Sequence, residues 1–121
     1  MSSRDGLGRA CLELGLAYEL RLDRVQPRFR LTLDTVDGRQ ILQLTLRDEH
    51  DVTPWVLDVD RERQGVLFEM TVKTVKREPS FDLWLEEVER ERYLVVRREG
   101  RWRLIRAEGV GTVEKGIDLP G

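Results

Sequence analysis

Apolar residues at the start of the chain recur with the spacing of a helix. One face of this segment collects side chains at intervals of three or four residues: Leu7, Cys11, Leu14, Tyr18 and Leu22. The pattern predicts a helix over residues 7–22. Asp5 stands where an N-cap is expected, and Gly15 falls in the middle of the predicted helix.

The clearest alternation of apolar and polar residues spans residues 28–47, on both sides of Asp37-Gly38. An Asp-Gly pair favours a two-residue type I′ turn, because both positions of that turn need a positive φ. The turn fixes the register and places three apolar pairs on one face: Phe29 with Leu46, Leu31 with Leu44, and Leu33 with Leu42. Turn chemistry and alternation therefore predict the same antiparallel hairpin.

The middle of the chain predicts two strands and then a helix. A short strand is expected at residues 55–59 and a second at residues 66–72, where apolar and polar residues alternate. Pro79-Ser80 interrupts this pattern. The apolar residues that follow are three, one and three positions apart: Phe81, Trp84, Leu85 and Val88. Acidic residues lie between them, and this spacing predicts a short helix.

A second hairpin is predicted at residues 93–106, around Glu99-Gly100. Its register pairs Val95 with Leu104 and Arg97 with Trp102 on one face, and Leu94 with Ile105 on the other. Apolar residues on both faces indicate a hairpin that is central in the sheet or partly covered by a partner chain. Three of them are the expected interface: Leu94, Val96 and Ile105.

The order of these elements predicts an α+β fold. Hairpins with few helices indicate an antiparallel sheet of about six strands, with one or two helices packed on one face. The hairpins at 28–47 and 93–106 form the main part of that sheet. The 121 residues fit one domain, 1–121, in which residues 108–121 are glycine-rich and are expected to be a loop-like tail.

Charge and cysteine content narrow the classes of function. Charged residues make up 36% of the chain, but 21 Lys and Arg nearly balance 23 Asp and Glu, which leaves a formal net charge of -2. Such a balance favours neither nucleic acid nor a membrane surface as partner. The single cysteine cannot form a disulfide within the chain. We find neither a membrane-spanning run nor a signal-peptide pattern and expect a cytoplasmic protein.

The polar segment 48–53 is the first candidate site. It combines the sole histidine of the chain with carboxylates and a hydroxyl, and its expected ligand-binding residues are Asp48, His50, Asp51 and Thr53. A histidine among carboxylates is suited to acid–base chemistry or to binding a polar ligand. The spacing matches no defined metal-binding loop, so no metal is expected. The alternative interpretation is a solvated loop between two strands.

The C-terminal segment 108–116 is the second candidate. Gly109 and Gly111 form a Gly-x-Gly pattern whose backbone amides can approach an anion, and Lys115 adds a positive charge. Glu114 occupies the position of the third glycine of a dinucleotide-binding fingerprint, and no helical pattern follows. The expected ligand is therefore a small anion rather than a dinucleotide. The alternative is a flexible loop.

The third candidate is a basic group on the second hairpin, with Tyr93 and Trp102 among its members: Arg97, Arg98, Arg101, Arg103 and Arg106. Basic and aromatic residues on a sheet are typical of domains that bind single-stranded RNA. The predicted register places these arginines on both faces, and it sets Arg97 beside Trp102 as a cation–π pair. Nucleic acid is therefore the less favoured partner.

Two of these segments resemble, in the same order, motifs of the CbiD family, the cobalt-precorrin methyltransferases of anaerobic cobalamin biosynthesis. Residues 48–55 are similar to the family's Asp-Asp-Pro-Asp-Val-Thr-His-Gly, with Pro54-Trp55 in place of His-Gly. Residues 108–117 are similar to its Gly-Glu-Gly-Val-Gly-x-Val-Thr-Lys-x-Gly-Leu. The resemblance covers the first third of the family. The larger part, which would bind S-adenosylmethionine, has no counterpart in this chain.

The resemblance implies a small non-catalytic domain that binds an anionic tetrapyrrole or acts with a partner subunit. The resemblance assigns no catalytic residue, and no cofactor is expected in this chain. Methyl transfer with S-adenosylmethionine would need a missing domain or a partner. Two other interpretations stay open. One is a homodimeric, chaperone-like protein-binding module, and the other is an RNA-binding module that uses the Arg-rich hairpin.

Overall fold

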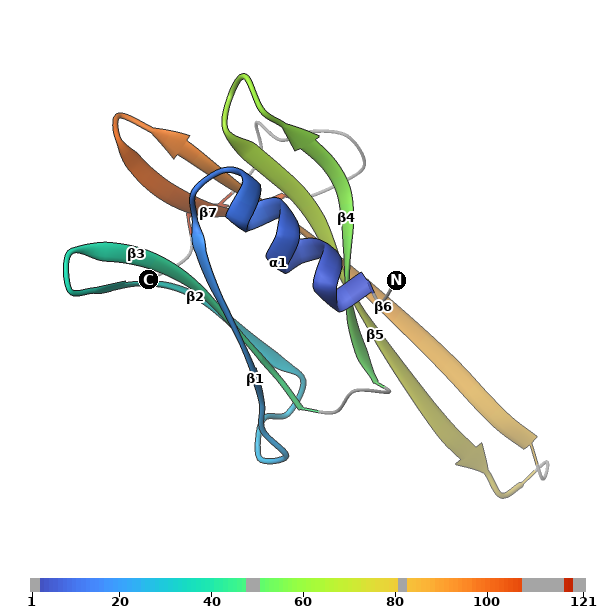
Figure 1. Ribbon diagram of the computed structural model, residues 1–121. Helices are drawn as coiled ribbons and strands as arrows, with labels where there is room; N and C mark the ends of the chain where they lie inside the picture. The colour runs from blue at the N-terminus through green and yellow to red at the C-terminus, as the bar shows by residue number, and fades with distance from the viewer. Residues whose placement is uncertain (1–2, 48–50, 81–82, 108–116, 119–121) are drawn as a thin grey trace.

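The computed structural model describes residues 3–47, 51–80, 83–107 and 117–118, which form one helix and eight strands (Figure 1). Their bounds are α1 (Ser3–Glu13), β1 (Ala17–Leu22), β2 (Phe29–Val36), β3 (Arg39–Leu46), β4 (Val52–Asp60), β5 (Gly65–Glu78), β6 (Leu83–Arg98), β7 (Arg101–Ala107) and β8 (Ile117–Asp118). No helix within these ranges has the length and hydropathy of a membrane-spanning segment.

The described strands form two sheets, with the orders β1-β3-β2 and β4-β5-β6-β7-β8. Neighbouring strands are antiparallel except β1 and β3, which are parallel. The α+β class and the mainly antiparallel pairing are confirmed, but the single sheet of about six strands is wrong. Each sheet has an apolar face that contributes to the main core, and the 11 residues of α1 are too few to cover a wide sheet. The two sheets bury these faces against each other instead.

Both predicted hairpins are confirmed in register. In the first, Leu31 pairs with Leu44, and the turn residues Asp37 and Gly38 have φ of 52° and 77°. In the second, the turn residues Glu99 and Gly100 have φ of 54° and 73°. Its pairing joins Val95 to Leu104, Leu94 to Ile105 and Arg97 to Trp102. Short-range turn chemistry therefore determines both hairpins.

The helix predicted over residues 7–22 is wrong in its second half. The observed α1 ends at Glu13, and Gly15 follows with a φ of +80°, a conformation that favours glycine. Residues 17–22 then form β1, which pairs with β3 from Ala17 opposite Ile41 to Leu22 opposite Leu46. For residues 17–22, hydrogen bonding to β3, which is distant in sequence, therefore outweighs the helical spacing of the apolar residues. Asp5 lies inside α1 and is not its N-cap.

The short helix expected at residues 81–88 is also wrong. Residues 83–88 belong to β6, which pairs without interruption with β5 from Leu83 opposite Glu78 to Val96 opposite Gly65. Trp84 and Val88 are four positions apart, a spacing that fits one face of a strand as well as one face of a helix. The pairing with β5 decides between the two. The strands expected at 55–59 and 66–72 are confirmed as parts of β4 and β5.

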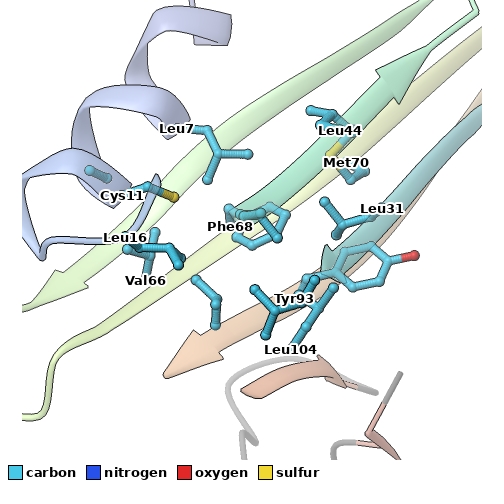
Figure 2. Close-up of a cluster of buried hydrophobic side chains, with 14 of the residues drawn as sticks. Leu7, Cys11, Leu16, Leu31, Leu44, Val66, Phe68, Met70, Tyr93 and Leu104 are labelled. Carbon is cyan, nitrogen blue, oxygen red and sulfur yellow. The ribbon is translucent and has the colours of Figure 1, made fainter. Parts of the chain in front are cut away.

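The main core lies between the two sheets and beneath α1. Leu7 and Cys11 of the helix, Leu44 of β3, and Phe68 and Met70 of β5 are fully buried (Figure 2). Tyr93 stacks on Phe68, with ring centroids 5.7 Å apart. α1 contacts β1 and β4 and so closes the space between one edge of each sheet (Figure 1).

Candidate protein-interaction surface

Most of the ligand-binding residues expected from the sequence lie outside the described residues: Asp48, His50, Gly109, Gly111 and Lys115. Asp51 is exposed just before β4, and its carbonyl oxygen accepts a hydrogen bond of 2.7 Å from the Lys73 amide. Thr53 is half-buried in β4, opposite Thr71 of β5. The anion site implied by the resemblance to the cobalt-precorrin methyltransferases therefore stays a prediction.

The described part of the chain contains neither a cluster of metal ligands nor a reactive thiol. No group of three or more His, Cys, Asp or Glu side chains there could hold a metal ion. Cys11 belongs to α1 and is fully buried in the main core, and this burial raises the pKa of its thiol from 9.0 to about 12. The thiol is therefore protonated and shielded at neutral pH, which is typical of a core cysteine.

The three expected interface residues lie on the face of the second sheet that points away from the main core. Leu94, Val96 and Ile105 form a separate cluster with Leu67. Each of the three is only 7–8% exposed in the single chain. They contribute little exposed apolar surface, so an interface there stays a prediction.

The arginines of the second hairpin are divided between structural contacts and solvent. Arg97 lies over the Trp102 ring, 5.9 Å from its centroid, as expected. Arg106 donates a hydrogen bond of 3.1 Å to Glu91. Arg98, Arg101 and Arg103 are exposed. The basic group is thus spread over both faces of the hairpin and not gathered into one patch.

The largest departure from the expected architecture is a two-stranded arm, defined here as residues 73–78 of β5 and 83–90 of β6. Pairing of β4 with β5 begins at Val72, and pairing of β7 with β6 begins at Arg92. Beyond these two residues, β5 and β6 pair with each other and with no other described strand. Figure 1 shows the two strands extending well past the rest of the molecule.

Five large apolar side chains are exposed on this arm: Val75, Leu83, Trp84, Leu85 and Val88. Trp84 is 70% exposed and is the most exposed of the five. The pairing of Arg77 with Trp84 and of Lys73 with Val88 places Trp84, Val88 and Val75 on one face, which we call the tryptophan face. A two-stranded ribbon alone is marginally stable in water, so an apolar face on it needs a cover.

Charge is separated between the two strands of the arm. The outer part of β5 is net basic, with Lys73, Lys76 and Arg77 against Glu78, and the outer part of β6 is net acidic, with Glu86, Glu87 and Glu89 against Arg90. Lys73 pairs with Glu86 at 3.2 Å and Lys76 with Glu87 at 3.6 Å, and all four side chains are about half exposed or more. Exposed pairs of this kind contribute little to stability, about 0–1 kcal/mol each. Their main effect is a ribbon with one basic and one acidic strand.

The base of the arm is held to the body by a polar cluster around Glu91. The Tyr93 hydroxyl donates a hydrogen bond of 2.7 Å to Glu91. Arg106 pairs with Glu91 at 3.1 Å, and Arg28 pairs with Glu89 at 2.8 Å and with Glu91 at 3.6 Å. Burial and the Glu91 carboxylate raise the pKa of Tyr93, so its hydroxyl stays a donor. A groove of about 420 Å³ lies beside this cluster, between Arg28, Arg47 and the start of the arm.

The sequence contained a signal for the arm that the helical interpretation hid. From Glu87 to Glu91 acids occupy every second position, a period of two that fits a strand, whereas Leu83, Leu85 and Glu86 depart from this alternation. No protein-family model matches the chain, and neither a curated protein nor a solved structure is significantly similar to it. The arm is therefore the feature from which a function is best argued.

Proposed function

We propose that this chain is a non-catalytic protein-binding module in which the arm of one copy docks on the arm of a second copy. The observation that carries the proposal is the tryptophan face, where Trp84, Val75 and Val88 are 70%, 54% and 40% exposed. Large aromatic side chains at the centre of an apolar patch are typical anchors of protein interfaces. The Arg77 guanidinium lies over the Trp84 ring, 5.9 Å from its centroid, and leaves Trp84 70% exposed.

The separation of charge supports a second copy as the occupant. We consider two arms stacked with their tryptophan faces together and related by a two-fold axis that runs parallel to the strands. In this arrangement the basic strand of each copy lies over the acidic strand of the other. Lys73, Arg77 and Arg90 share the tryptophan face with Glu86, so both signs are present there. Such a two-fold contact is self-complementary, which is the usual symmetry of soluble dimers.

This arrangement also relates to the interface expected from the sequence. Trp84, Val88, Leu94 and Val96 are all at even positions of β6, so they lie on the same face of the strand. In the proposed dimer the contact is made along this face but on the arm, where the apolar residues are exposed, and not at the covered cluster around Leu94.

Sedimentation equilibrium of the wild-type chain and of Trp84→Glu tests the proposal. We expect a reversible dimer at tens of micromolar for the wild type. The variant should raise the dissociation constant by about thirty-fold or more, since losing an interface anchor costs about 2 kcal/mol. Trp55→Glu is the matched control, because Trp55 is 49% exposed on β4, outside the arm. A wild type that remains a single chain, or equal weakening in both variants, would contradict the proposal.

A further inference from the structure

A second pocket lies at the end of β6 that is distant from the arm. The turns after α1, β2 and β6 meet there, and each contributes a glycine with positive φ: Gly15, Gly38 and Gly100. The pocket has a volume of about 220 Å³. A Cβ added at any of these three glycines would meet nothing within 4 Å. The backbone of three turns is therefore open to a small ligand.

Two guanidinium groups and no carboxylate line this pocket. They belong to Arg39, at the start of β3, and Arg97, near the end of β6. The nearest acids in sequence, Asp37 and Glu99, precede the turn glycines but are not part of the lining. Within the described residues, no carboxylate pairs with either arginine. Among the described residues, the lining of the pocket thus carries two positive charges and no negative one.

One of these charges is held in place before any ligand arrives. The Arg97 guanidinium lies over the Trp102 ring, 5.9 Å from its centroid. Trp102 is itself fixed, because the Gln40 side chain is hydrogen-bonded to both its backbone N–H and its backbone carbonyl. A preorganised arginine loses less side-chain entropy when it binds an anion than a free one does.

We propose that this pocket binds an oxyanion, namely the phosphate or carboxylate group of a small molecule. Arg39 and Arg97 would each donate charge-assisted hydrogen bonds, for which the planar guanidinium is well suited. An oxyanion bound in the pocket would be attracted by both positive charges. This inference rests on residues outside the arm and is independent of the dimer proposed above.

Titration of the ¹⁵N-labelled chain with inorganic phosphate, followed by amide chemical shifts, tests this site, with a sodium chloride series at equal ionic strength as reference. We expect saturable shifts at Gly38, Arg39, Arg97 and Gly100, with a dissociation constant in the millimolar range or tighter. Arg39→Gln and Arg97→Gln should each weaken binding about ten-fold, the effect of one lost charge-assisted hydrogen bond. A parallel acetate series shows whether a carboxylate is bound as well.

Arg98→Gln is the matched control, because Arg98 is an exposed neighbour that does not line the pocket. It should leave the dissociation constant unchanged within a factor of about two, because its side chain lies on the opposite face of β6 from Arg97 and is screened by solvent. The proposal is overturned by either of two results. One is the absence of saturable shifts with both anions. The other is equal weakening in Arg98→Gln, which would show attraction by general charge alone.

Discussion

The side-chain amide of Gln40 makes two hydrogen bonds to the backbone of Trp102, 62 residues later in the chain. Its Oε1 accepts from the Trp102 N–H at 2.8 Å, and its Nε2 donates to the Trp102 carbonyl at 3.3 Å. Gln40 belongs to β3 of the first sheet and Trp102 to β7 of the second. The Gln40 side chain therefore makes the two hydrogen bonds that an adjacent strand would make to the Trp102 backbone, and these bonds join the two sheets.

Replacing Gln40 with Leu should destabilise the fold by about 2 kcal/mol, because both Trp102 backbone groups lose their partner next to a buried side chain. Urea unfolding followed by circular dichroism measures this change. Thr35→Ala is the control, since Thr35 is exposed in the same hairpin, and it should change the free energy of unfolding by less than about 0.5 kcal/mol. Equal effects of the two substitutions would show that the Gln40 contact is unimportant.

Alanine at two neighbouring glycines of α1 should have opposite effects. A Cβ at Gly8 would lie 2.9 Å from Cδ1 of Tyr18, closer than packed atoms approach, so Gly8→Ala forces the Tyr18 ring or the helix to move. At Gly6 the nearest atom is Val56 Cγ2 at 3.9 Å, an ordinary contact. Gly6→Ala should therefore stabilise the fold by up to about 1 kcal/mol through helix propensity, whereas Gly8→Ala should destabilise it by about 1–3 kcal/mol.

Thermal and urea unfolding of the two glycine variants show whether each substitution raises or lowers the free energy of unfolding. The same sign for both, or a neutral Gly8→Ala, would show that the helix does not approach β1 as closely as described.

Cys11 should make the stability of the fold depend on pH in alkaline solution. Burial raises the pKa of its thiol from 9.0 to about 12, so above pH 9 the unfolded chain loses a proton that the folded chain retains. The stabilisation from keeping the thiol protonated is complete below pH 9 and is lost as pH rises towards 12. The slope from this residue is at most about 1.4 kcal/mol per pH unit.

The pH dependence is checked by urea unfolding of the wild type and Cys11→Ala at several values between pH 8 and pH 11. The wild type should lose stability more steeply above pH 9. Tyr93, whose pKa is also raised, contributes in the same direction to both proteins, so it cancels in the comparison. Parallel curves for the two proteins would mean that the thiol is accessible to water in the folded chain.

The parts of the fold that the sequence predicted correctly are those that local chemistry determines. Asp37-Gly38 and Glu99-Gly100 specify tight turns, and each turn fixes the register of its hairpin without reference to the rest of the chain. The spacing from Leu7 to Leu22 predicted one long helix, because nothing near Tyr18 indicates its distant partner on β3. Parallel pairing of β1 with β3 is a tertiary interaction that a periodicity analysis cannot detect.

The candidate site was harder to predict for a related reason. Trp84 and Val88 are compatible with one face of a helix or of a strand, and only pairing with β5 shows that they belong to an arm. The predicted interface at Leu94, Val96 and Ile105 came from apolar residues on both faces of a hairpin. The structure shows that these residues are covered within the chain. Exposure, which depends on the whole fold, is what distinguishes the tryptophan face.

Amide hydrogen exchange measured over a range of protein concentrations tests the central claim most directly, because it reports both association and its location. If two copies dock through the arm, exchange at residues 73–78 and 83–90 should slow as concentration rises through the dissociation constant. Exchange in β2 and β3 should stay constant, since neither strand takes part. Arm exchange that is fast and independent of concentration, up to about 100 μM of chain, would contradict the account.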